Sequence, residues 1–96
     1  MSFQDSIRDK YKSLGYKVVK VMKLSENGYP DLLCMKDAKC VWIESKEAND
    51  TLKPLQMLRI DELNAIGFQA FCLQKGKGVI YPEGYDKSFT KGIYTP

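Results

Sequence analysis

The chain is expected to form one α/β domain across residues 1–96, in which a mixed central sheet is flanked by helices. Two stretches show apolar residues at helical spacing, one at the N-terminus and one after a central proline. Three strand-like runs lie between these stretches and a fourth follows the second. The predicted order is therefore α-β-β-β-α-β. Hydrophobic residues at 44% and charged residues at 28% are typical of a packed domain.

The first helix is expected over residues 2–14. Its inward face is predicted from apolar residues that recur at helical spacing: Phe3, Ile7, Tyr11 and Leu14. Gly15 follows as a C-terminal cap. The run 16–22 is rich in β-branched residues and predicts a strand, which the Asn-Gly and Pro signals then end.

The next two strands are expected to form a hairpin. Asp31 opens the apolar run D-L-L-C-M, and the polar turn K-D-A-K separates it from C-V-W-I-E-S-K. If Met35 and Cys40 flank the turn, Asp31 and Glu44 lie at the same open end of adjacent strands. The period of two along the second strand places Glu44 and Lys46 on one face.

Pro54 fits the first turn of a second helix that extends to about Ile66 and stops at Gly67. Its inward residues are expected to be Leu55, Leu58, Leu63 and Ile66. The run 68–74 predicts a fourth strand, parallel to the third because a helix connects them. A short strand is expected at 79–81, and 81–96 is otherwise an irregular tail and a candidate dimer contact.

Composition excludes several classes of site. The chain has no histidine, which rules out mixed Cys/His zinc sites, Ser-His-Asp triads and Cys-His pairs. The odd set Cys34, Cys40 and Cys72 has no C-x-x-C spacing and predicts buried thiols. No signal-peptide core and no apolar run near the ~18 residues of a membrane span occur, so a cytoplasmic, intracellular protein without a membrane partner is expected.

The net charge of +3 permits a polyanionic partner without requiring one. Lysine supplies 13 of the 15 positive side chains. Lysine contacts phosphate as a point charge, whereas bidentate reading of bases suits arginine. Contacts to a nucleic-acid backbone are therefore favoured over sequence-specific reading.

The pattern acid-x-Lys occurs twice. Asp37-Ala38-Lys39 falls in the predicted turn, where solvated charges belong, whereas Glu44-Ser45-Lys46 ends a strongly apolar strand. A frayed strand end that meets water would also explain the second triplet. Asp31 favours a site instead, because two carboxylates without histidine suit a hard ion such as Mg²⁺, with Mn²⁺ as a substitute. Lys46 would steer or activate a metal-associated water and stabilise charge that develops on phosphorus.

The ordered set G-Y-P-D, V-W-I-E-S-K and L-K-P-L-Q, followed by an amphipathic helix and G-F-Q-A-F, resembles the VRR-NUC family of the PD-(D/E)XK nucleases. The resemblance covers about residues 3–73 and implies a restriction-endonuclease-like fold. It also implies that Asp31 and Glu44 bind the metal together with the main-chain carbonyl of Ser45. Lys46 would be the catalytic lysine, and Gln56 would orient the lysine, the water or the phosphate.

One expected group departs from the family pattern. Related nucleases often have a glutamate on the first helix, where this chain offers Gln4 and Asp5. Asp5 would complete the site as a shorter acid. Its alternative interpretation is a charge that is favourable at the N-terminus of a helix.

The resemblance implies a Mg²⁺-dependent DNA endonuclease that acts as a homodimer on branched DNA such as Holliday junctions, in a phage or bacterial setting. Two alternatives remain open. One is a catalytically weakened nucleic-acid-binding module of the same fold. The other is a restriction-like nuclease, for which Arg8 and Arg59 provide little apparatus for reading bases.

Overall fold

The computed structural model describes residues 1–84. Its elements, in chain order, are α1 (Phe3–Ser13), β1 (Lys17–Lys20), β2 (Leu32–Lys36), β3 (Lys39–Lys46), α2 (Pro54–Ala65), β4 (Gln69–Gln74) and β5 (Gly78–Tyr81). The predicted order is confirmed, and the short last strand is present as β5. The strand predicted over 16–22 is shorter. The proposed dimer contact of the tail falls largely on residues 85–96, outside the described part of the chain.

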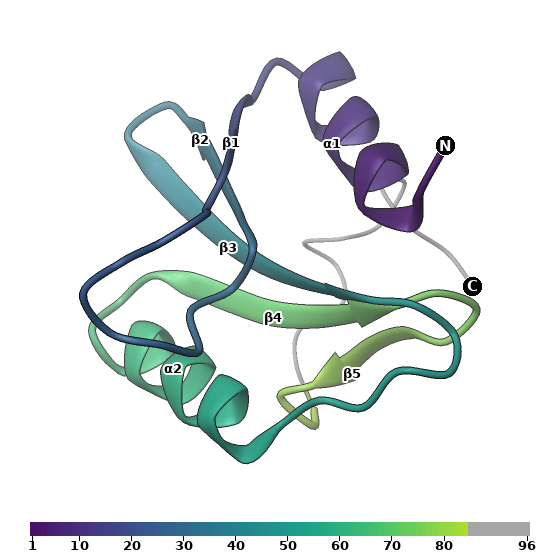
Figure 1. Cartoon of the computed structure of the whole chain (residues 1–96). Helices are drawn as coiled ribbons and strands as arrows, with labels where there is room; N and C mark the ends of the chain where they lie inside the picture. The colour runs from purple at the N-terminus through teal and green to yellow at the C-terminus, as the bar shows by residue number, and fades with distance from the viewer. Residues whose placement is uncertain (85–96) are drawn as a thin grey trace.

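The five strands form one mixed sheet in the order β1-β2-β3-β4-β5. The β3–β4 pair is parallel, as the helical connection predicted, and the other three pairs are antiparallel. The helices α1 and α2 lie on opposite faces of this sheet (Figure 1). None of the helices found in residues 1–84 is long and apolar enough to cross a bilayer.

The β2–β3 hairpin has the predicted register, with Met35 opposite Cys40 and Leu32 opposite Ile43. Its turn residues Asp37 and Ala38 have φ values of 52° and 62°. A turn with positive φ at both central positions matches the right-handed twist of the flanking strands. The first acid-x-Lys triplet is therefore part of an exposed turn, as expected.

The core has one layer on each face of the sheet. The α1 layer contains the helix residues Phe3, Ile7 and Tyr11 and strand residues that include Leu32, Cys34, Val41 and Ile43. The α2 layer contains Ile60, Leu63, Ala70 and Cys72, with Trp42 packed against them. Val41 and Ile43 thus face α1 while Trp42 faces α2, which confirms the predicted alternation along β3.

Four of the residues predicted to face inward are exposed, so this part of the prediction was wrong. The exposed fractions are 43% for Leu14, 41% for Leu55, 48% for Leu58 and 72% for Ile66. Leu14 and Ile66 are the C-terminal caps of their helices, beyond the last packed turn. In α2 Leu63 is buried as predicted, and Ile60, which was not predicted, is buried with it against β4. Cys34 and Cys72 are buried as predicted, whereas Cys40 is only half-buried.

Candidate active site

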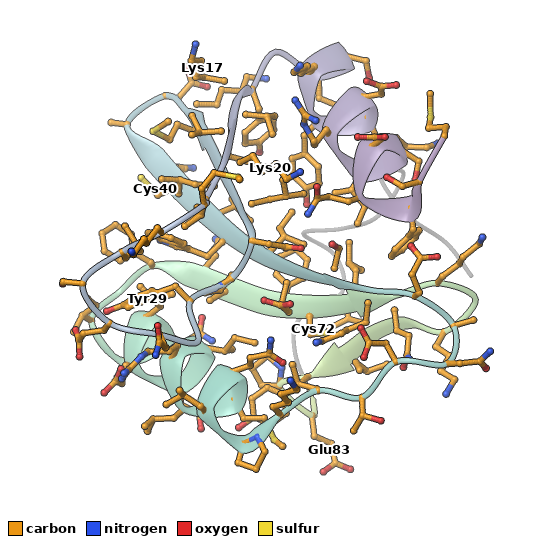
Figure 2. The ribbon with its side chains drawn as sticks, viewed as in Figure 1. Lys17, Lys20, Tyr29, Cys40, Cys72 and Glu83 are labelled. Carbon is orange, nitrogen blue, oxygen red and sulfur yellow. The ribbon has the colours of Figure 1, made fainter. Side chains whose placement is uncertain are left out.

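The open end of the β2–β3 hairpin brings the predicted acidic residues together. Leu32 and Ile43 are the last paired residues of the hairpin, and Asp31 and Glu44 are the residues next to them at its open end. The chain enters this end through Gly28, whose φ is +89°, and a fully buried Pro30. On the other side of β3, Glu44 pairs with Cys72, which is labelled in Figure 2. Asp31 and Glu44 are close enough that the charge of Asp31 acts on the Glu44 carboxyl.

The Asp31 carboxylate is oriented by two other elements. Oδ1 accepts a hydrogen bond of 3.0 Å from the main-chain N–H of Ser45, and Oδ2 accepts one of 2.6 Å from the Ser45 hydroxyl. Nε2 of Gln4, from the first turn of α1, donates a further bond of 2.8 Å to Oδ2. A carboxylate offers about four lone-pair positions. Asp31 is therefore held firmly and still has capacity for one more partner.

Glu44 and Lys46 are both buried, with exposed fractions of 6% and 5%. Nζ of Lys46 lies 3.7 Å from Oε2 of Glu44 and 3.8 Å from Oδ2 of Asp50. Burial, with the neighbouring charge of Asp31, raises the pKa of Glu44 to about 8, and Lys46 opposes this rise only in part. The Glu44 carboxyl therefore keeps its proton to a higher pH than a carboxyl in water does.

Gln56 lies against the same Glu44 oxygen that Lys46 approaches. Its Nε2 is 3.5 Å from Oε2 of Glu44, a long hydrogen bond. Its Oε1 accepts a hydrogen bond of 3.0 Å from the main-chain N–H of Lys53. Lys53 is the N-cap residue of α2, which begins at Pro54, and this hydrogen bond helps to cap the helix. The start of α2 therefore presents the Gln56 amide to the site.

Asp5 lies apart from these residues. Its main-chain N–H donates to the hydroxyl of Ser2 at 3.1 Å, and its carboxylate pairs with Arg8 at 3.3 Å. The hydrogen bonds with Ser2 hold the pKa of Asp5 below its usual value, and Arg8 adds to this effect. The adjacent Gln4 is the α1 residue that reaches Asp31.

Sequence reasoning missed two residues beside Lys46. Asp50 supplies the second carboxylate near the ammonium, and Gln74 on β4 bonds the loop that carries Asp50. The available signal was a glutamine that ends an otherwise apolar strand, at the position paired with Lys46 in the parallel register.

Within residues 1–84, no three His, Cys, Asp or Glu side chains cluster closely enough to form a metal site by themselves. Asp31 and Glu44 contribute two carboxylates. An ion at this place would need further oxygens from the main chain, from water or from a phosphate.

No protein-family model and no curated protein matches this chain. Among solved structures, a VRR_NUC domain is 24% identical with a TM-score of 0.64, and the match covers 72% of this chain and 76% of that one. The Archaeoglobus fulgidus Hjc, a Holliday junction resolvase from an archaeal hyperthermophile, is 15% identical with a TM-score of 0.59, and the match covers 76% of this chain and 65% of that one. The chain therefore has the restriction-endonuclease-like fold of these two structures, as its sequence predicted.

Proposed function

We propose that the chain is a metal-dependent endonuclease of the VRR-NUC type that hydrolyses phosphodiester bonds in DNA. The observation that carries this proposal is the meeting of Asp31 and Glu44 at one end of the hairpin, with the buried ammonium of Lys46 next to Glu44. The likeness in fold to a VRR_NUC domain and to a Holliday junction resolvase supports the same chemistry.

The residues of the site fit a hard divalent cation. The donors that we propose are oxygens: the carboxylates of Asp31 and Glu44 and the main-chain carbonyl of Ser45. Burial and the Asp31 charge raise the pKa of Glu44 to about 8, and a cation would offset this cost of holding two carboxylates together. Mg²⁺ prefers oxygen ligands and keeps several waters, and we expect Mn²⁺ to substitute for it. When bound, the ion would supply positive charge for the phosphate and a water of lowered pKa.

The protein side chains supply the remaining parts of the reaction. Lys46 would donate hydrogen bonds to a phosphate oxygen and stabilise the negative charge that develops there. Gln4 and Ser45 hold Asp31 in place, while Gln56 lies against Glu44. Because Lys46 is almost fully buried, its charge acts in a surrounding of low dielectric, where it has a stronger effect than in water.

The proposed substrate is branched DNA, such as a junction, and the proposed active form is a homodimer. A two-fold dimer would place two sites for paired cuts on a branched substrate. Sequence-specific reading is disfavoured because both arginines are engaged within the fold. Arg59 bonds the carbonyl of Asn27 at 2.8 Å and Glu62 at 3.0 Å, and Arg8 pairs with Asp5.

A second candidate function is a DNA-binding module that has lost cleavage. The observation that favours it is the neutral amide of Gln4 at Asp31, where related nucleases often have an acid. Metal binding would then be weaker, because no group of three His, Cys, Asp or Glu side chains in the described residues could hold the ion.

The test is a panel of labelled junction, flap and linear duplex DNAs incubated with Mg²⁺, Mn²⁺ or EDTA. We expect cleavage of branched DNA that requires the metal. Lys46→Ala should lower the rate by at least about 100-fold, the scale for removal of one transition-state contact. Lys39→Ala is the matched control, because this exposed lysine lies at the other end of the same strand.

Three other results would change the conclusion. If wild type leaves every substrate intact and Lys46→Ala behaves identically, the nuclease proposal is wrong. Tight DNA binding without metal-dependent turnover would support the binding module. Discrete bands from long random-sequence DNA would support sequence-specific cleavage instead.

A further inference from the structure

We propose that Gln74 is a positioning residue that fixes the loop 47–50 so that Asp50 holds the ammonium of Lys46 in place for catalysis. The inference rests on the proposed function, because it concerns the placement of the proposed catalytic lysine.

The first observation is a buried amide that bonds one loop three times. Gln74 is 4% exposed, and it ends β4 directly beside Lys46 in the parallel register. Its Nε2 lies 3.0 Å from the carbonyl oxygen of Glu47, 3.3 Å from that of Ala48 and 2.8 Å from that of Asp50. A buried polar group is costly unless it is bonded, and here the bonds tie the loop to the end of the sheet.

The second observation connects this loop to the lysine. The main-chain N–H of Asp50 donates to the carbonyl of Glu47 at 3.1 Å, which closes a turn. The N–H of Thr51 donates to Oδ1 of Asp50 at 2.8 Å, so the carboxylate is oriented with Oδ2 3.8 Å from Nζ of Lys46. Each step from the Gln74 amide to the ammonium is thus a direct contact within the fold.

The Asp50 carboxylate needs a restraint because much of it is open to water. The Asp50 side chain is 54% exposed, and an exposed ion pair is weak because water screens it and ordering the side chain costs entropy. The loop must therefore be held from its buried side if the carboxylate is to stay near the lysine. Gln74 provides that restraint.

Among the described residues, Lys46 has two carboxylate neighbours, Glu44 and Asp50. The proposed function commits Glu44 to the cation. Asp50 is then the anionic neighbour that remains to set the position of the ammonium relative to the phosphate. Loss of the restraint should lower the rate of the chemical step more than it weakens DNA binding.

The experiment compares three variants in steady-state cleavage of the best junction substrate. Gln74→Leu removes the donors, Asp50→Asn keeps the shape of the side chain and removes its charge, and Gln74→Leu/Asp50→Asn combines them. The matched control is Asn64→Ala, which also removes a part-buried amide that bonds the backbone of β4, at Ala70.

We expect each single variant to lower kcat by on the order of 10- to 100-fold with KM changed by less than about threefold. The double variant should be no slower than the slower single variant, because both changes remove the same contact. Asn64→Ala should lower the melting temperature and leave kcat within about twofold of wild type. Amide exchange at Asp50 and Thr51 should become faster in Gln74→Leu and stay unchanged in Asn64→Ala.

The outcomes separate the two claims. A wild type that cuts DNA while Gln74→Leu keeps its kcat overturns this inference alone, and so do losses that multiply in the double variant. A wild type that cuts no DNA overturns the proposed function and this inference with it. If Gln74→Leu does not fold, Asp50→Asn decides, because its exposed side chain can be changed without disturbing the core.

Discussion

Nε2 of Gln4 donates a hydrogen bond of 2.8 Å to Oδ2 of Asp31 and thereby joins the first turn of α1 to the open end of the β2–β3 hairpin. The donor is a neutral amide, so it orients Asp31 without adding charge. The charge of Asp31 acts on Glu44, and no group of three His, Cys, Asp or Glu side chains in residues 1–84 could hold a metal ion. The contact from Gln4 therefore orients Asp31 and leaves the net charge of the candidate metal site unchanged.

Gln4→Glu should tighten Mg²⁺ binding, because it adds a third carboxylate beside Asp31. We expect a dissociation constant lower by on the order of 10-fold, since affinity for such ions rises with the number of charged oxygen ligands. Without metal, the variant should be less stable by about 1 kcal/mol through repulsion between like charges. Calorimetric titration with Mg²⁺ and urea unfolding measure the two effects. Asp5→Asn is the control on the same helix, and equal affinities for wild type and Gln4→Glu would contradict the prediction.

The metal-free protein should lose stability as pH rises from about 4.5 to about 8. The pKa of Glu44 is raised from 4.5 to about 8 by burial and by Asp31, against the opposing charge of Lys46, while Asp50 adds to the rise. In this pH window the folded state keeps the Glu44 proton that the unfolded state has lost. The contribution of this proton to the free energy of unfolding is complete below the pKa of Glu44 in the unfolded state. It is lost as the pH rises through the pKa of Glu44 in the folded state. Each unit of pH lowers the free energy of unfolding by at most about 1.4 kcal/mol.

Urea unfolding in EDTA at several pH values between 4.5 and 9 measures this slope. Glu44→Gln should flatten it, because the amide cannot titrate. Glu47→Gln, which changes an exposed acid on the following loop, should keep it. A slope that persists in Glu44→Gln would assign the pH dependence to another group.

Gly28→Ala should be more destabilising than Gly67→Ala, although both positions have positive φ. The φ values are +89° and +102°, and a side chain in this region costs about 1–2 kcal/mol. A Cβ on Gly28 would lie 2.7 Å from Cγ of Leu55, whereas one on Gly67 would meet nothing within 4 Å. The additional overlap should cost about 1–3 kcal/mol. Denaturant midpoints compare the two variants, and equal losses would show that the loop before Asp31 does not pack tightly on α2.

Leu63→Ala should cost about 2–5 kcal/mol of unfolding free energy, the usual range for a buried leucine. Leu58→Ala should change it by less than about 0.5 kcal/mol, as expected for an exposed position. The two leucines lie on the same helix and are 5% and 48% exposed, so the comparison isolates burial from helix propensity. A large loss at Leu58 would mean that this face of α2 is covered in solution.

Much of the candidate site could be predicted because it depends on local geometry. Hairpin register follows from the turn, so Asp31 opposite Glu44 could be expected from the position of the K-D-A-K segment. The period of two along a strand then places Lys46 on the face of Glu44. These relationships involve neighbouring strands and short distances along the chain.

The contacts that could not be predicted depend on helix rotation and on distant segments. Gln4 and Asp5 are adjacent, and the burial of Phe3 and Ile7 decides which of them points to Asp31. In α2, packing on β4 buries Ile60 together with the predicted Leu63 and leaves Leu58 exposed. The bonds from Gln74 to the loop 47–50 join segments more than 20 residues apart.

The sequence by itself determined the order of the elements, the parallel β3–β4 pair and the alignment of Asp31, Glu44 and Lys46, because backbone periodicity and turn chemistry act locally. Only the tertiary structure decided that Gln4 meets Asp31 and that Gln74 ties down the loop of Asp50. The physical reason is that several orientations of a helix on a sheet have similar local energies. The same holds for the several hydrogen-bond partners that a buried amide can choose. The close packing of the whole core selects among them.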